Sequence, residues 1–329
     1  MVDVEKGGVA LPAPATIGAL AARFGGQVDA GAEAVVVTAV APITSARAGQ
    51  LAPLLSRRRA FVEAARSTEA VLLVDASLAA IAPPGRRWVH EAAAYALARV
   101  LETAAPPPPP DLRALAHIDA AAAVDPTASI GPGVAIVGAA TIGPGARVEP
   151  NAVIYGNVTV GARAVIGAGA VIGRPGFGWA PSPSGGVVRV PQLGGVIVEE
   201  DAEIGPLATV DAGTLGPTVI GRGAKLDAHV HVGHNAVIGP FALVAAQAGF
   251  AGSVEIGAGA LVGGQAGVAD HVRVGAGARL AAKAGVIGDV AAGAVVAGYP
   301  AVARERWLRA TAEALRESGA RGTKGRRSR

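Results

Sequence analysis

From residue 118 onward, one aliphatic side chain recurs every six residues along the chain. The series keeps this period in three stretches, over 118–172, 198–210 and 220–286. Its members are aliphatic except for Phe250 and comprise Ile118, Val124, Ile130, Ile136, Ile142, Val148, Ile154, Val160, Ile166, Ile172, Val198, Ile204, Val210, Ile220, Leu226, Val232, Ile238, Val244, Phe250, Ile256, Val262, Val268, Val274, Leu280 and Val286. A period of six is neither helical nor the simple alternation of a half-buried strand. It predicts short parallel strands joined by tight turns, three to each coil of 18 residues.

The residues that follow the aliphatic positions support this prediction. Gly is frequent there, as in Ile130-Gly131 and Ile256-Gly257, and Gly accepts the backbone geometry of tight turns. The aliphatic side chains would stack at the ordinary spacing between strands. The pattern is typical of hexapeptide-repeat, left-handed β-helices, which are usually homotrimers and often acyltransferases. We therefore expect a mostly β fold, with a left-handed parallel β-helix over residues 117–300 as the catalytic domain.

The repeat is interrupted twice, over residues 173–195 and 213–218. Both interruptions predict loops that leave the β-helix, and loops on a regular scaffold are frequent sites of function. The longer one contains Phe177 and Trp179, two of only 11 aromatic residues in the chain.

The residues before the repeat predict a different kind of domain. Apolar runs at 35–37 and 71–74 predict buried strands, and residues 90–101 have the spacing of an amphipathic helix. Residues 1–105 are therefore expected to form a small α/β domain of the nucleotide-binding type. A proline-rich linker follows over 106–116.

The C-terminal segment, 301–329, differs from the rest in charge. Residues 304–329 contain nine basic and three acidic side chains and so carry a net charge of +6. The whole chain carries +4, so the remaining residues carry −2. We expect a helix over 304–317 followed by a basic tail. Such a segment suits an acidic protein partner or is simply solvated; no nucleic-acid partner is expected.

Composition excludes several classes of site. Cysteine is absent, which excludes disulfides, thiolate zinc sites and a cysteine nucleophile. No apolar run is long enough to predict a transmembrane segment. The first residues, Met1–Lys6, lack the basic-then-apolar order of a signal peptide, so we expect a cytoplasmic protein.

Four of the six histidines lie within the repeat: His229, His231, His234 and His271. None occupies the stacked aliphatic position, so each is expected on an outer face or corner. A histidine titrates near neutral pH and can therefore act as a general base. Three neighbouring imidazoles would also suit a zinc-dependent hydratase, but successive positions on a strand and turn point in different directions. No metal site and no cofactor are expected.

Several sequence blocks resemble one family closely. They read GRPGFGWA from Gly173, RVPQLGG from Arg189 and KLDAHVHVGHNAVIG from Lys225. The chain thus resembles the UDP-3-O-acylglucosamine N-acyltransferases of lipid A biosynthesis. The resemblance implies that His234 is the catalytic base, that His271 is a second active-site histidine, and that Gly252 offers its backbone N–H to the thioester oxygen.

The same resemblance implies substrates and partners. It assigns substrate binding to Asp227, Asn235, Phe177, Trp179 and Gln192, and it implies acyl carrier protein as the acyl donor, a UDP-amino-sugar as the acceptor and a homotrimer as the assembly. The chain departs from the family pattern at Ala212, at Ala228 and over 52–57, where an aromatic residue and an Asn for uracil are missing. Another amino-sugar nucleotide as acceptor, a zinc-dependent hydratase and a non-catalytic trimeric scaffold remain as alternatives.

Overall fold

The computed structural model describes residues 2–3, 8–105, 111–298, 309–310, 312–313 and 316. The chain divides into two compact units, Met1–Pro108 and Pro109–Arg329. Residues 106–110 of the expected linker lie outside the described residues, as does most of the expected C-terminal helix and tail. Within the described ranges, no helix combines the length and apolar character needed to cross a membrane.

The described part of the first unit is a seven-stranded sheet with the order β1-β2-β4-β5-β6-β7-β3. Its strands are β1 (Val2–Asp3), β2 (Gly8–Thr16), β3 (Gln27–Val28), β4 (Val36–Val40), β5 (Gln50–Leu54), β6 (Val71–Asp75) and β7 (Arg87–His90). Its helices are α1 (Ile17–Phe24), α2 (Arg59–Ser67), α3 (Ala93–Glu102) and the 3₁₀ turn η1 (Ala76–Leu78). Alternate residues of β6 enter two separate apolar clusters, one with α1 and α3 and the other with α2. Helices therefore cover both faces of the sheet, as an α/β unit requires.

The helix predicted over 90–101 begins later than expected, at Ala93. The residues before it form β7, in which His90 pairs with Asp75 of β6. The ring of His90 is bonded within the unit: Nδ1 accepts from the Ala92 N–H at 2.8 Å, and Nε2 lies 3.1 Å from the carbonyl oxygen of Phe24. The predicted start of the helix was wrong because His90 pairs with β6 and therefore belongs to strand β7.

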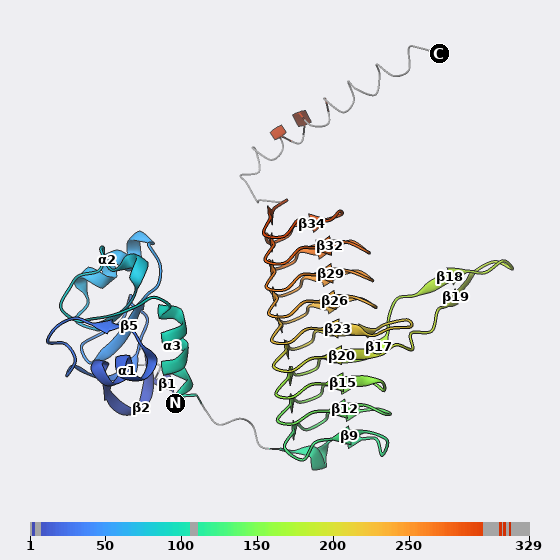
Figure 1. Cartoon of the computed structure of the whole chain (residues 1–329), viewed down its shortest axis with the longest axis horizontal. Helices are drawn as coiled ribbons and strands as arrows, with labels where there is room; N and C mark the ends of the chain where they lie inside the picture. Colours follow the sequence, from blue (N-terminus) through green and yellow to red (C-terminus); the bar gives the residue numbers. More distant parts are fainter. Residues whose placement is uncertain are drawn as a thin grey trace. The chain divides into compact units, whose positions relative to one another are not determined.

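The second unit is a parallel β-helix with three sheets, which confirms the predicted fold class (Figure 1). Sheet 1 contains β8 (His117–Ile118), β11 (Ala135–Ile136), β14 (Val153–Ile154), β17 (Val171–Pro175), β22 (Thr209–Ala212), β25 (His231–Val232), β28 (Gly249–Phe250), β31 (Gly267–Val268) and β34 (Gly285–Val286). Sheet 2 contains β9 (Ala123–Val124), β12 (Thr141–Ile142), β15 (Val158–Val160), β20 (Val196–Val198), β23 (Thr218–Ile220), β26 (Val237–Ile238), β29 (Glu255–Ile256) and β32 (Arg273–Val274). Sheet 3 contains β10 (Ser129–Ile130), β13 (Arg147–Val148), β16 (Val165–Ile166), β21 (Glu203–Ile204), β24 (Lys225–Leu226), β27 (Leu243–Val244), β30 (Leu261–Val262), β33 (Arg279–Leu280) and β35 (Val295–Val296), and the turn η2 (Arg113–Leu115) precedes the first coil.

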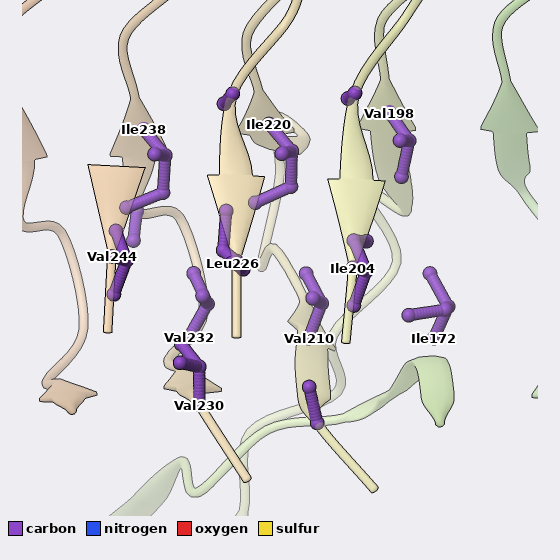
Figure 2. Packing of buried hydrophobic residues seen from close by; sticks show 14 of the residues in the cluster. Ile172, Val198, Ile204, Val210, Ile220, Leu226, Val230, Val232, Ile238 and Val244 are labelled. Carbon is purple, nitrogen blue, oxygen red and sulfur yellow. The ribbon is translucent and has the colours of Figure 1, made fainter. Parts of the chain in front are cut away.

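The aliphatic series fills the interior of the β-helix (Figure 2). Its members are buried except for Ile118 and Val124 in the first coil, which are half-buried. A second inner position, two residues earlier in each repeat, is taken by small side chains such as Ala224, Val230 and Ala236. Burial of a Val, Leu or Ile side chain is worth roughly 1.5–3 kcal/mol, so these stacked columns hold the coils together.

Both interruptions of the repeat leave sheet 1, directly after β17 and directly after β22. The first forms the antiparallel hairpin β18 (Trp179–Pro181) and β19 (Val187–Arg189), which projects from the β-helix (Figure 1). The bases of the two insertions are bonded to each other, because the Gly194 N–H donates to the Gly213 carbonyl and the Gly213 N–H to that of Gly195. We call this edge the insertion corner; it comprises residues 176–195, 213–217, 233–236, 251–254 and 269–272.

Candidate active site

The insertion corner brings together the three residues expected to be catalytic. His234 follows β25, Gly252 follows β28 and His271 follows β31, and these three strands are consecutive neighbours in sheet 1. His234 is half-buried and His271 is exposed, so neither enters the core, as expected. His271 lies in a turn with a φ of 58°, and its N–H donates to the Gly252 carbonyl. Gly252 therefore separates the two histidines along the corner.

The imidazole of His234 lies directly over Gly252. A Cβ placed on Gly252 would come within 2.6 Å of Cε1 and 2.7 Å of Nε2 of this ring. Carbon atoms in ordinary contact are about 3.5–4.0 Å apart, so any larger residue at 252 would displace the ring. Only glycine permits this approach.

The neighbouring Asn235 sets the orientation of the His234 ring. Its Oδ1 accepts from the Thr214 N–H at 2.9 Å, while its Nδ2 donates to the Gly216 carbonyl at 3.0 Å. This fixes Oδ1 as the atom that faces Nδ1 of His234, at 3.2 Å. Because an amide oxygen only accepts, Nδ1 must carry the proton. In the neutral ring the lone pair is therefore on Nε2, and no described residue is hydrogen-bonded to that atom.

Gln192 and Thr214 tie the two insertions to this asparagine. The Thr214 hydroxyl lies 2.7 Å from Oε1 of Gln192 and 3.0 Å from Oδ1 of Asn235. Nε2 of Gln192 donates to the Val190 carbonyl at 3.1 Å, and the side chain is buried. Both polar atoms of the Gln192 amide are thus bonded within the protein, and through Thr214 they help to hold Asn235 in place.

The backbone N–H of Gly252 is the second polar group beside the His234 ring. Within the described part of the chain, it donates to no backbone or side-chain acceptor. Other described turns of the β-helix, such as those at Ala246 and Ala258, also leave the equivalent N–H without a bond. What distinguishes Gly252 is the His234 ring that lies against it. An unpaired N–H next to a base can bind an oxygen on which negative charge develops.

The aromatic residues of the first insertion are accessible. Phe177 is 81% exposed and Trp179 is 43% exposed. The guanidinium of Arg189 lies over the Trp179 ring at 4.4 Å from its centroid, a cation–π contact that orders the hairpin.

Asp227 is the one expected site residue that the fold places elsewhere. It follows β24 of sheet 3, so it lies at the corner between sheets 3 and 1 rather than at the insertion corner. Its carboxylate accepts from the Ala228 N–H at 2.7 Å. It lines an open groove of about 700 Å³ along the outer face of sheet 3. One chain alone does not bring Asp227 to His234.

The other two histidines of this region diverge from His234. His229 occupies the same turn as Asp227, while His231 points outward from β25 with Nδ1 at 2.7 Å from the Thr209 hydroxyl. Over the described residues, no group of three or more His, Asp or Glu side chains is placed to hold a metal ion.

A buried carboxylate beside His234 escaped the sequence analysis. Asp211 has a side chain only 4% exposed, with Arg174 Nε at 3.4 Å from Oδ1 and His231 Nε2 at 3.9 Å from Oδ2. Burial raises the pKa of Asp211, while the nearby His231, Arg174 and His234 oppose the rise. Its position directly after the buried Val210, where the repeat favours Gly, was the available signal.

Comparison with known proteins places this geometry in context. Residues 139–174 match the bacterial transferase hexapeptide family (six repeats). The UDP-3-O-acylglucosamine N-acyltransferase of Myxococcus xanthus is 56% identical over 146 residues, which are 43% of this chain and 42% of that protein. The enzyme of the same name from Chlorobium luteolum is 51% identical over 79 residues, 24% of this chain and 22% of that protein. The resemblance found in the sequence is confirmed.

These matched segments span less than half of the relatives' length. Among solved structures, the UDP-N-acetylglucosamine O-acyltransferase (LpxA) of Moraxella catarrhalis superposes with a TM-score of 0.53 at 25% identity, over 59% of this chain and 76% of that one. LpxA of Acinetobacter baumannii superposes with a TM-score of 0.50 at 23% identity, over 56% and 70%, which supports the left-handed β-helix fold.

Proposed function

We propose that the protein is an N-acyltransferase that moves an acyl chain, such as a hydroxyacyl chain, from a thioester to the 2-amine of a UDP-3-O-acyl-glucosamine in lipid A biosynthesis. One observation supports this most strongly: the free Nε2 of His234 lies beside the unpaired N–H of Gly252. Acyl transfer to an amine needs a base and an oxyanion donor next to each other. The named relatives are acyltransferases of this type.

The two groups act on opposite partners of the reaction. The amine attacks the thioester carbonyl carbon, and Nε2 of His234 accepts the proton that the nitrogen loses. Negative charge develops on the carbonyl oxygen, where the Gly252 N–H donates a hydrogen bond. The tetrahedral intermediate then collapses, the carbon–sulfur bond breaks, and the thiolate leaves with a proton returned from the imidazolium. His271, one coil beyond Gly252, is suited to hold the donor or the acceptor.

The acyl group passes directly between the substrates. The sequence contains no cysteine, so the most nucleophilic side chain for a covalent acyl-enzyme is missing. Asn235 orients the imidazole of His234, and among the described residues no hydroxyl is hydrogen-bonded to its Nε2.

A homotrimer with sites between subunits accounts for the place of Asp227. In one chain it lies at a different corner from His234, whereas an adjoining subunit can bring its own sheet 3 groove against the insertion corner. Phe177, Trp179 and Asn235 would contact the acceptor there, and Gln192 would support them. The first unit would hold the uracil end of the nucleotide.

Acyl carrier protein is the proposed donor, and the cytoplasm the proposed location. The basic residues of 304–329 suit an acidic carrier protein, because opposite charge speeds the encounter.

A thiol-release assay tests the proposal. Purified protein is mixed with an acyl carrier protein thioester and, in separate reactions, with UDP-3-O-acyl-glucosamine and other UDP-amino-sugars. We expect thiol release with the first acceptor and a loss of roughly 10²–10⁴-fold in His234→Gln, the usual contribution of a general base. Faster release with a different amino sugar would reassign the acceptor, for which the departures at Ala212 and Ala228 give a reason. No release with any acceptor would refute the proposal.

A further inference from the structure

The Asp211 carboxylate is enclosed next to the proposed base. Val210 pairs with Val232 across β22 and β25, so Asp211 stands beside the residue that precedes His234. Gly176 lies against both side chains: a Cβ placed on it would be 3.0 Å from His234 Cβ and 3.2 Å from Oδ2 of Asp211. The first insertion therefore covers the Asp211 carboxylate and packs against His234 at the same point.

The carboxylate is also incompletely bonded. Its Oδ1 is buried without a hydrogen-bond partner, and Arg174 approaches only to 3.4 Å. A buried polar atom without a partner costs stability, and burial of a charged carboxylate adds to that cost. Buried carboxylates beside a reactive side chain are frequent at functional sites, where their charge acts on that neighbour.

The other charged groups around Asp211 are more exposed than Asp211 itself. The side chains of Arg174 and His231 are each about half exposed, at 49% and 50%. A third charged group, the guanidinium of Arg189, lies near the glycine that covers Asp211. Its Nη1 is 3.4 Å from the carbonyl oxygen of Gly176. Water screens exposed charges much more strongly than buried ones. Water therefore screens the charge of the Asp211 carboxylate less than it screens the charges of Arg174 and Arg189.

We propose that Asp211 is a positioning residue for His234, and that its buried carboxylate stabilises the positive charge which the imidazole gains on accepting the proton of the amine. This role rests on the proposed function, because it matters only if His234 is the base. Asn235 fixes the direction of the ring, and Asp211 supplies the opposite charge without touching the substrate.

The test compares variants in which only charge changes. Asp211→Asn removes the carboxylate, and Arg174→Gln removes the exposed cation beside it. Asp201→Asn is the matched control, because it makes the same chemical change in an exposed carboxylate that pairs with Arg163 away from the insertion corner. The titration of His234 is followed by NMR of histidine-labelled protein, with its signal assigned by its loss in His234→Gln.

We expect the midpoint of the His234 titration to fall by about one pH unit in Asp211→Asn, the smaller effect of a nearby charge. It should rise in Arg174→Gln and stay unchanged in Asp201→Asn. In the acyl-transfer assay, Asp211→Asn should lower kcat by about tenfold, in proportion to one unit of titration shift, and move the acid limb of the pH profile to lower pH. KM should change little.

A structural role for Asp211 would lower kcat without moving the acid limb. An unchanged NMR midpoint in a folded Asp211→Asn protein overturns the proposal, and so does an equal shift in Asp201→Asn. If Asp211→Asn fails to fold, the direction of the shift in Arg174→Gln decides. Absence of acyl transfer by the unmodified protein would refute the proposed function alone, because the NMR midpoints still report whether Asp211 acts on His234.

Discussion

Replacement of Gly252 by alanine is the sharpest perturbation of the candidate site. The added methyl group would lie 2.6 Å from Cε1 and 2.7 Å from Nε2 of His234. The glycine belongs to the backbone of a regular coil, so it cannot retreat, whereas the half-buried histidine can rotate. The ring must then move by about 1 Å to reach an ordinary contact distance, which breaks its hydrogen bond to Asn235.

The expected loss of activity follows from this displacement. A misplacement of about 1 Å in a reacting group costs on the order of 10²-fold in rate. The loss of one hydrogen bond costs stability only about 1 kcal/mol, so the Tm should fall by no more than a few degrees. Activity and stability therefore separate in this variant, with kcat/KM reduced by roughly 10²-fold in the thiol-release assay.

The matched control is Gly285→Ala, which adds the same methyl group at an outward position of β34. A Cβ there meets no atom within 4 Å, and we expect activity and Tm close to those of the unmodified protein. If Gly252→Ala keeps more than half of its activity, the contact between His234 and Gly252 is not needed for the chemistry. If both glycine variants lose activity equally, the loss is not specific to the candidate site.

Four further outcomes follow from the structure. His271→Ala should reduce kcat less than His234→Ala, because His271 lies beyond Gly252; an equal reduction in steady-state assays would make the two histidines one unit. Phe250→Ala should lower the free energy of unfolding in urea by about 3–5 kcal/mol, because its side chain is stacked between Val232 and Val268; a loss below 1 kcal/mol would show that the column can collapse. Burial raises the pKa of Asp211 above its ordinary value of 3.8, so the charged carboxylate destabilises the folded state at neutral pH. Asp211→Asn should therefore raise the Tm at pH 7, and this gain should disappear as the pH falls towards 3.8. A lower Tm at pH 7 would contradict this prediction. Sedimentation at micromolar concentration should show a trimer, and a stable monomer would exclude a site shared between subunits.

The β-helix could be predicted from the sequence because its determinant is local and repeated. Each strand contributes one large aliphatic residue to the interior, so the period of six is visible without any knowledge of contacts. The register also places the histidines outside the core, as at His234 and His271. In the first unit, the same reasoning placed the start of a helix at residue 90, because the pairing of β7 with β6 is a contact between distant segments.

Two features of the site depended on contacts that no local pattern contains. Asp211 is covered by the segment around Gly176, which lies 35 residues earlier in the chain. Gln192 supports Asn235 only through Thr214, which belongs to a separate insertion. Each of these contacts joins two segments whose sequences give no sign of their meeting.

The position of the site follows from how a β-helix can accept insertions. A loop can leave without disturbing the stacked interior only where the chain turns out of a strand, and both insertions leave sheet 1 in successive coils, after β17 and after β22. Loops in neighbouring coils at one corner necessarily meet, and here they bond to each other and bury Gln192 between them. The next coil has no insertion, so His234 stands where the packed loops end and the regular backbone resumes. The loops hold its ring from one side through Asn235, and the regular coil presents the Gly252 N–H from the other. An oriented base beside an unpaired backbone donor is therefore a consequence of placing two insertions just before an uninterrupted coil.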